Sequence, residues 1–295
     1  MQLSLQKVKE TAMQIVFIVC ACVSILAVLL ICLFLFANGI PAIREIGVFD
    51  FLLTTKWKPL EGLYGILPMI IGSIYVTAGA IIIGVPIGVF CAVYMAQFCP
   101  KKIYKILKPT VDLLAGIPSI VYGFFGLVVI VPVMQYLTGT SGKSVLTASI
   151  MLGIMILPTI ISVSEAAIRA VPESYYEGAL ALGATHERSI FKVTLPAAKS
   201  GITAGVILGI GRAIGEAMAV NMVAGNQVQI PESIFDGVRT LTSNIVLEMG
   251  YATDLHREAL IATAVVLFVF ILIINLLFSL VKKKDKPKRK AGGKK

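Results

Sequence analysis

Six long runs of apolar residues dominate the chain, and each is close to the length that a helix needs to cross a membrane. They occupy residues 13–36, 67–95, 111–137, 145–168, 201–224 and 258–281. A transmembrane helix needs about 20 consecutive, mainly apolar residues to cross the hydrocarbon core. The pattern therefore predicts an all-α, polytopic membrane protein with six transmembrane helices.

Composition agrees with this pattern, and the distribution of charge adds an orientation. Only 14% of the 295 residues are charged, whereas a soluble domain carries about 25%. Of the 26 Lys and Arg residues, 19 fall in the two termini and in the loops around 96–110 and 169–200. Six fall on the opposite side, and Arg212 lies inside the fifth span. The positive-inside rule therefore predicts that both termini lie in the cytoplasm.

The spans divide the chain into three parts. Residues 1–66 form a first helix and an external segment that carries the only tryptophan, Trp57, and is expected to be a short packed flap. Residues 67–281 form the transmembrane domain, and residues 282–295 form a basic cytoplasmic tail. Such a tail could bind nucleic acid, but directly after a last span it is more typical of a stop signal that contacts anionic lipid.

The residues that would build a catalytic or metal site are scarce. The five cysteines lie in or at the edges of spans without metal-ligand spacing, which predicts buried, free thiols. Residues 139–144 are similar to a phosphate-binding P-loop, but Leu137 stands where that motif requires glycine. The two histidines, His186 and His256, are predicted on opposite sides of the membrane. We therefore expect no catalytic residue, no metal, no cofactor and no ATPase site in this chain.

The stretch between the second and third spans has two local signals. Ile103, Ile106 and Leu107 recur at helical spacing among lysines, which predicts a helix along the cytoplasmic interface. Pro118 then removes a helical hydrogen bond and restrains the residue before it. The third span is therefore expected to open with an offset or broken helix, although a simple structural kink fits equally well.

The fifth span contains two charged residues, Arg212 and Glu216. A charge near the bilayer centre costs at least about 2.5 kcal/mol, so both side chains should face the bundle interior or a watery path. Gly201, Gly205 and Gly209 share a helical stripe about 80° wide with them. Glycine at this spacing allows close helix packing, which places the stripe inside the bundle.

The two charges support two readings. Arg212 lies about 17 Å along the helix from Gly201, near half the thickness of the hydrocarbon core. Glu216 follows one turn later, within reach of an i,i+4 ion pair. The residues could serve the passage of a charged substrate, or they could form a neutralising pair that fixes the helix register.

A cytoplasmic segment predicts two short helices joined by a tight turn. The first covers residues 172–182 and ends at Gly183, which can adopt the left-handed conformation that closes helices. The second is capped by Thr185 and should stop before Pro196. The segment is either a docking site for a soluble partner or an ordinary intracellular loop.

This segment resembles a known motif. The matching positions are Glu177, Gly178, Ala179, Gly183, Val193, Leu195 and Pro196. They resemble the EAA loop of ABC-importer membrane subunits, which has alanine in place of Gly178 and isoleucine in place of Val193. The resemblance implies a type I, MetI-like permease architecture in a bacterial plasma membrane, with the loop coupled to a cytoplasmic ATPase.

Two further runs narrow the resemblance. Residues 116–126 and 209–220 are similar to phosphate-specific permeases, and the second run is closer to the PstC type than to the PstA type. The resemblance implies a channel formed with a PstA-type permease, driven by a PstB-type ATPase dimer and supplied by an external PstS-type phosphate-binding protein. Arg212 and Glu216 would then serve translocation, and the chain itself would not be an enzyme.

Three alternatives remain open at this point. The cargo could be another oxyanion, such as sulfate or molybdate, because the EAA loop does not identify it. A standalone passive channel would lack a use for the docking helices. A membrane-embedded enzyme would need a nucleophile or a metal cluster at membrane depth.

Overall fold

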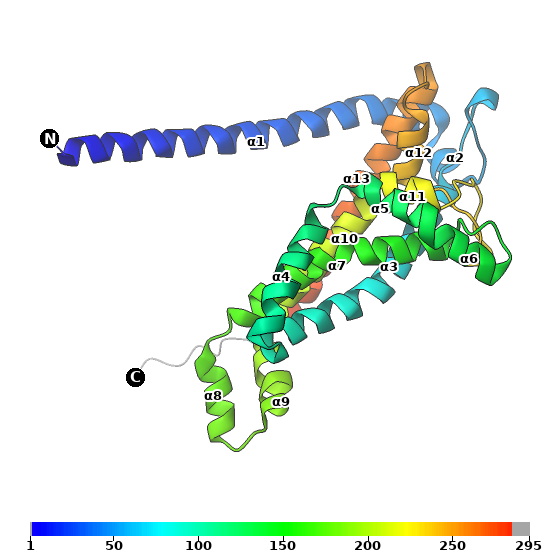
Figure 1. Cartoon of the computed structure of the whole chain (residues 1–295). Helices are drawn as coiled ribbons and strands as arrows, with labels where there is room; N and C mark the ends of the chain where they lie inside the picture. Colours follow the sequence, from blue (N-terminus) through cyan, green and yellow to red (C-terminus); the bar gives the residue numbers. More distant parts are fainter. Residues whose placement is uncertain (1, 285–295) are drawn as a thin grey trace.

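The structure is a computed structural model that describes the backbone of residues 2–284 and the side chains of residues 9–277. It is a bundle of helices with a small hairpin of two strands (Figure 1). The helices are α1 (Gln2–Ile46), α2 (Val48–Leu53), η1 (Pro59–Glu61), α3 (Leu67–Val93), η2 (Tyr94–Phe98), α4 (Lys101–Gly116), α5 (Ser119–Phe125), η3 (Gly126–Ile130), α6 (Val131–Thr138), α7 (Val145–Arg169), α8 (Glu173–Ala181), α9 (His186–Ser189), η4 (Ile190–Thr194), α10 (Leu195–Gly215), α11 (Met218–Val223), α12 (Leu241–Glu248) and α13 (Asp254–Lys284).

Six helical segments of the described chain are long and apolar enough to cross a membrane, as predicted. They are Lys9–Ile46, Leu67–Phe98, Ser119–Thr138, Val145–Arg169, His186–Gly215 and Asp254–Leu277. Several predicted boundaries are wrong, and two of them fall at breaks in a helix. The third span begins at Ser119 because the chain breaks at Pro118, so residues 111–116 belong to α4 instead. The fifth span ends at Gly215 rather than at 224.

The first helix stands apart from the bundle along most of its length (Figure 1). Its later part packs on α13, where Phe36 and Phe268 meet edge to face at 6.0 Å. The five cysteines are free as predicted, but none is buried: Cys20 and Cys22 are exposed on α1. The prediction of buried thiols is wrong: α1 lacks neighbours within the chain at Cys20 and Cys22, and the other three cysteines are partly buried. Of the predicted basic tail, residues 285–295 lie outside the described residues, and 282–284 continue α13.

The predicted external flap is folded against the bundle. Strands β1 (Trp57–Lys58) and β2 (Leu63–Tyr64) pair antiparallel, with Trp57 opposite Tyr64. Trp57 is buried and donates a hydrogen bond from Nε1 to Glu248 of α12 at 2.8 Å. The helices α2 and α12 lie at one end of the bundle, and α8 and α9 project from the other (Figure 1). The flap and the EAA-like loop are thus at opposite ends.

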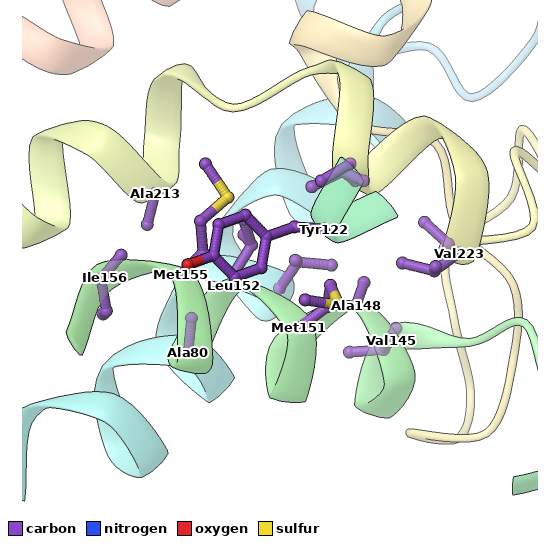
Figure 2. Packing of buried hydrophobic residues seen from close by; sticks show 14 of the residues in the cluster. Ala80, Tyr122, Val145, Ala148, Met151, Leu152, Met155, Ile156, Ala213 and Val223 are labelled. Atoms are coloured by element: carbon purple, nitrogen blue, oxygen red, sulfur yellow. The ribbon is translucent and has the colours of Figure 1, made fainter. Parts of the chain in front are cut away.

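The main core forms where α3, α7 and α10 pack together and α5 and α11 close over them. Tyr122 of α5 lies in this core, between Ala213 of α10 and the side chains of Met151, Leu152 and Met155 on α7 (Figure 2). Its hydroxyl donates to the Leu114 carbonyl oxygen of α4 at 2.8 Å. This bond satisfies a carbonyl in the last turn of α4 and holds α5 in place after the break.

Two of the helix breaks are close to each other in space. One separates α4 from α5 at Ile117 and Pro118, and it confirms the predicted break at this proline. The other separates α10 from α11. A Cβ atom added to Gly123 of α5 would come within 2.8 Å of Ala219 Cα on α11, so the segments that follow the two breaks touch backbone to backbone. Irregular backbone at membrane depth is tolerated where protein buries it or where it lines a cavity.

Candidate functional site

Arg212 lies in the last turn of α10, on the face that packs against α7. Its guanidinium NH1 donates a hydrogen bond to Thr159 Oγ1 at 3.3 Å. Thr159 is ten residues from Arg169 and fourteen from Val145, so it lies about 15 Å from one end of α7 and about 21 Å from the other. The arginine is therefore opposite the middle of a spanning helix.

The glycine part of the predicted stripe on the fifth span is confirmed, whereas Glu216 lies beyond the end of α10. A Cβ atom added to Gly205 would come within 3.0 Å of Ser164 Oγ, and one added to Gly209 within 2.7 Å of Ile160, both on α7. A Cβ atom added to Gly201 would collide with Ala167, which also lies on α7. The glycines thus allow α10 to approach α7 closely, and this contact brings Arg212 to the bundle interior.

The i,i+4 ion pair between Arg212 and Glu216, one of the two readings of this spacing, is not formed. The helix ends at Gly215, and Glu216 has extended backbone with φ −73° and ψ 126°. The Glu216 carboxylate instead accepts a hydrogen bond from the Ala219 backbone N–H at 3.0 Å, at the start of α11. Its backbone carbonyl accepts from Thr242 Oγ1 of α12 at 2.9 Å.

The break explains how both charges are accommodated without pairing. A helix carries partial negative charge at its C-terminus and partial positive charge at its N-terminus. Arg212 lies in the last turn of α10, and Glu216 precedes the first turn of α11. Each charge is therefore at the helix end that stabilises it. The structure thus does not support the hypothesis that Arg212 and Glu216 form a neutralising ion pair.

The guanidinium retains donors for a ligand. Within residues 9–277, no carboxylate lies at ion-pair distance from Arg212, and Thr159 is its hydrogen-bond partner. The side chain is half-buried, and its charge acts electrostatically on the nearby Tyr122 hydroxyl. Guanidinium presents five N–H donors in a planar fork that matches oxyanions, so the arrangement suits an anion that passes between helices.

The EAA-like segment forms a helical hairpin at the opposite end from the flap. Helix α8 is exposed at Glu177 and Gly178, and it is followed by Gly183 with φ +82°. A Cβ at this angle would be strained, which explains the glycine. The Thr185 hydroxyl then accepts from the Arg188 N–H at 3.3 Å and caps α9, as predicted.

The hairpin has an exposed apolar face and a groove. Leu182 at its tip is 91% exposed, and Tyr175 is also exposed. A groove of about 490 Å³ runs between α8 on one side and α9 and η4 on the other, and Ala179 contributes to its lining. Exposed apolar side chains beside a groove are typical of a protein docking surface.

The predicted end of the second short helix before Pro196 is wrong. The chain continues as a π-helical turn, η4, and then directly as α10. Pro196 occupies the first turn of α10, where a missing N–H is tolerated. Leu195 packs in a small core with Ile190 and Ala198, so the hairpin is joined rigidly to the fifth span.

Sequence reasoning missed Thr159 and Tyr122. Both are polar side chains in apolar runs, and Thr159 follows Pro158, which was a signal that could have drawn attention to it. Their partners, Arg212 and Leu114, became evident only from the packing. Within the described part of the chain, no group of three His, Cys, Asp or Glu side chains is placed to hold a metal ion.

Comparison with known proteins decides the family. Residues 84–284 match the family of binding-protein-dependent transport system inner membrane components. The chain belongs to this family. It is thus a multi-pass membrane component of a transport system, and its type I permease architecture agrees with the solved structures that it resembles.

Relatives and solved structures extend this match. The probable ABC transporter permease protein YqgH of Bacillus subtilis is 42% identical over 271 residues, which cover 88% of each chain. The phosphate transport system permease protein PstC of Mesorhizobium japonicum is 35% identical over 81% of this chain and 80% of its own length. An inward-facing structure of the MetNI methionine ABC transporter superposes with a TM-score of 0.62 over 79% of this chain and all of that one, at 20% identity. The latter likeness concerns the fold alone.

Proposed function

We propose that this inner membrane component is the PstC-type permease subunit of an ATP-driven importer that moves inorganic phosphate into the cytoplasm. The observation that carries the proposal is a guanidinium at the middle of the bundle that no carboxylate among residues 9–277 neutralises. The PstC proteins of Mesorhizobium japonicum and Pasteurella multocida, at 35% and 33% identity, support phosphate as the cargo.

The chemistry of the site fits an inorganic oxyanion. Phosphate that enters the low-dielectric interior of a membrane needs a compensating positive charge. A guanidinium can donate two parallel N–H hydrogen bonds to two oxygens of one phosphate. The single, long bond to Thr159 leaves the other donors of Arg212 for the ligand. Glu216, one residue beyond the end of α10, limits how tightly an anion binds there, so that phosphate can leave again.

The energy comes from a partner. We infer that a PstB-type ATPase dimer contacts the hairpin, with Glu177, Gly178, Ala179, Gly183, Leu195 and Pro196 as the coupling residues. A PstA-type permease completes the channel, and a PstS-type protein delivers phosphate on the side of Trp57 and α12. Both termini then lie in the cytoplasm, in agreement with the charge distribution.

Uptake of radiolabelled phosphate into vesicles that contain the full complex tests this function. We expect uptake that requires ATP on the hairpin side and the binding protein on the flap side, and that unlabelled phosphate suppresses. An excess of sulfate or molybdate should leave uptake unchanged. Suppression by sulfate or molybdate instead of phosphate would assign the permease to another oxyanion, and uptake without ATP would make it a passive channel.

A further inference from the structure

Glu165 is a buried carboxylate in the last two turns of α7, away from Arg212. The residue is 2% exposed. Its Oε1 accepts hydrogen bonds from the Tyr104 hydroxyl at 2.7 Å and from Arg169 Nε at 2.8 Å. Its Oε2 lies 3.4 Å from Lys108 Nζ. Both oxygens of this carboxylate are thus held by charged or hydroxyl donors.

These contacts join three separate elements. Tyr104 and Lys108 belong to α4, and Arg169 belongs to α7. Arg169 also donates from NH2 to the Met95 carbonyl oxygen in η2 at 2.7 Å, and its guanidinium lies 4.5 Å from the centre of the Tyr104 ring. Glu165 and its donors therefore fasten η2, which continues α3, to the first half of α4 and to the end of α7. We call these four residues, Tyr104, Lys108, Glu165 and Arg169, the Glu165 cluster.

The elements that the Glu165 cluster joins lead to both functional regions. Helix α7 ends at Arg169, and only residues 170–172 separate it from α8 of the hairpin. Helix α4 leads through Ile117 and Pro118 to α5, which contacts α11 at Gly123. The cluster therefore lies between the hairpin and the two helix breaks beside Arg212.

Glu165 is the buried member of this network, whereas the side chains of Lys108 and Arg169 are 30% and 45% exposed. Hydrogen bonds from two cations and a hydroxyl to one buried carboxylate are strong and directional, and leaving that carboxylate partly unsatisfied is costly. Elements tied by such a network tend to keep discrete arrangements rather than to deform gradually. A displacement of α8 would thus carry α4 with it, and through α4 the segment after the Pro118 break.

We propose that Glu165, with Tyr104, Lys108 and Arg169, is a positioning residue that transmits the movement of the coupling hairpin to the helix breaks beside Arg212. The inference rests on the proposed function, because it concerns how ATP hydrolysis on a partner is coupled to passage of phosphate. Glu165 contacts neither phosphate nor ATP in this scheme. Its loss should therefore uncouple the two processes without stopping hydrolysis.

The test compares the full complex with wild-type chain and with Glu165→Gln in the same vesicles. Phosphate uptake and ATP hydrolysis are both measured, and their ratio is the readout. We expect hydrolysis to stay within about twofold of wild type and the ratio of phosphate to ATP to fall about fivefold, because a neutral amide cannot serve both cations. A merely structural role would reduce both activities together and would leave the ratio unchanged.

Asp112→Asn is the matched control. Asp112 also pairs with Lys108, at 3.3 Å, but it is 54% exposed and does not contact Glu165. The ratio should be unchanged in this variant. An unchanged ratio in Glu165→Gln, an equal fall of uptake and hydrolysis, or the same ratio loss in both variants would each overturn the inference.

If the Glu165→Gln complex does not assemble, Tyr104→Phe tests the coupling role of the Glu165 cluster instead. It removes one hydroxyl and keeps the ring beneath Arg169, and we expect the ratio to fall about twofold. An unchanged ratio in this variant would overturn the inference as well. If the wild-type complex itself moves no phosphate with ATP, the proposed function fails instead, and that outcome is distinct from a failure of the coupling role.

Discussion

Arg212 and Glu165 are both charged residues in spanning helices, but their surroundings are opposite. Glu165 is 2% exposed, and two cations and a tyrosine hydroxyl hold its oxygens. Arg212 is half-buried and has one neutral partner, Thr159, at 3.3 Å within the described residues. One charge is satisfied by its own protein, whereas the other is stabilised mainly by the end of its helix.

This difference separates a structural charge from a charge that is available to a ligand. A buried ion pair is costly to break because each remaining charge is left without compensation. A cation that has no ion-pair partner can be removed with little effect on folding, but its removal weakens the binding of any anionic ligand that it holds. Substitutions at the two sites should therefore affect different measurements.

The largest expected effect is on transport by Arg212→Gln. The loss of a charge-assisted interaction with an anion is worth about 1.5–3 kcal/mol, so phosphate uptake by the full complex should fall about 10- to 100-fold. Because Arg212 pairs with no carboxylate in the described part of the chain, the assembled complex should form normally and unfold at nearly the wild-type temperature. Normal uptake by a normally assembled variant would exclude Arg212 from the phosphate path.

The next largest effect is on the stability of the complex and is expected at Glu165. Glu165→Leu removes the common partner of Lys108 and Arg169, and we expect the free energy of unfolding to fall by about 2 kcal/mol. Thermal unfolding of the purified complex measures this loss. Arg212→Gln serves as the comparison, and an equal fall in the unfolding temperature of both variants would erase the distinction between the two charges.

A third change tests the hairpin that we propose to couple the ATPase to the Glu165 cluster and to Arg212. Glu177→Lys reverses a charge on the exposed face of α8, and about tenfold less ATPase should co-purify with the permease. Asp112→Lys, on α4 away from the hairpin, should retain the wild-type amount. Full stoichiometry and full coupling in Glu177→Lys would contradict the assignment of this docking surface.

A smaller effect is expected from Thr159→Val, which removes the hydrogen bond between Thr159 and Arg212 and keeps the charge of the arginine. Uptake should fall about threefold, since a single neutral hydrogen bond contributes about 1 kcal/mol. The comparison is Thr203→Val, because the Thr203 hydroxyl bonds to the Lys199 carbonyl of its own helix. Equal losses in the two variants would show that Thr159 has no particular role beside the arginine.

The smallest effect is a pH dependence at the Glu165 cluster. The hydrogen bond to Glu165, followed by burial, raises the pKa of the Tyr104 hydroxyl above its ordinary value. The folded state therefore holds this proton more tightly, so the contribution to stability is complete below about pH 10 and is lost as pH rises through the higher, folded-state pKa. Unfolding temperatures of wild type and Tyr104→Phe, measured between pH 9 and 11, should converge as pH rises. A constant difference across that range would contradict this linkage.

Much of the architecture was predictable because it depends on local patterns. The apolar runs, the glycine stripe of α10 and the break at Pro118 each follow from spacing or from the chemistry of one residue. The break after Gly215 has no proline, and the residues around it are apolar or glycine apart from Arg212 and Glu216. It depends on contacts with α12 and α5, which the local pattern does not contain.

The Glu165 cluster was not predictable for a similar reason. Tyr104 and Glu165 are 61 residues apart in the chain, and Arg169 and Met95 are 74 apart. The Arg212–Glu216 spacing left an ion pair open as one of two readings, because an uninterrupted helix was assumed. Spacing rules apply within one helix, whereas the partners of a charge are set by which helices meet.

The most direct test of the account is the accessibility of position 159, beside an intact Arg212. In a complex whose permease has its five cysteines replaced by alanine, Thr159→Cys should react with a small, water-soluble thiol reagent during ATP turnover. Phosphate should slow this reaction, and sulfate should not. A thiol that stays unreactive throughout the transport cycle, or one whose reaction phosphate leaves unchanged, would contradict a phosphate path along Arg212.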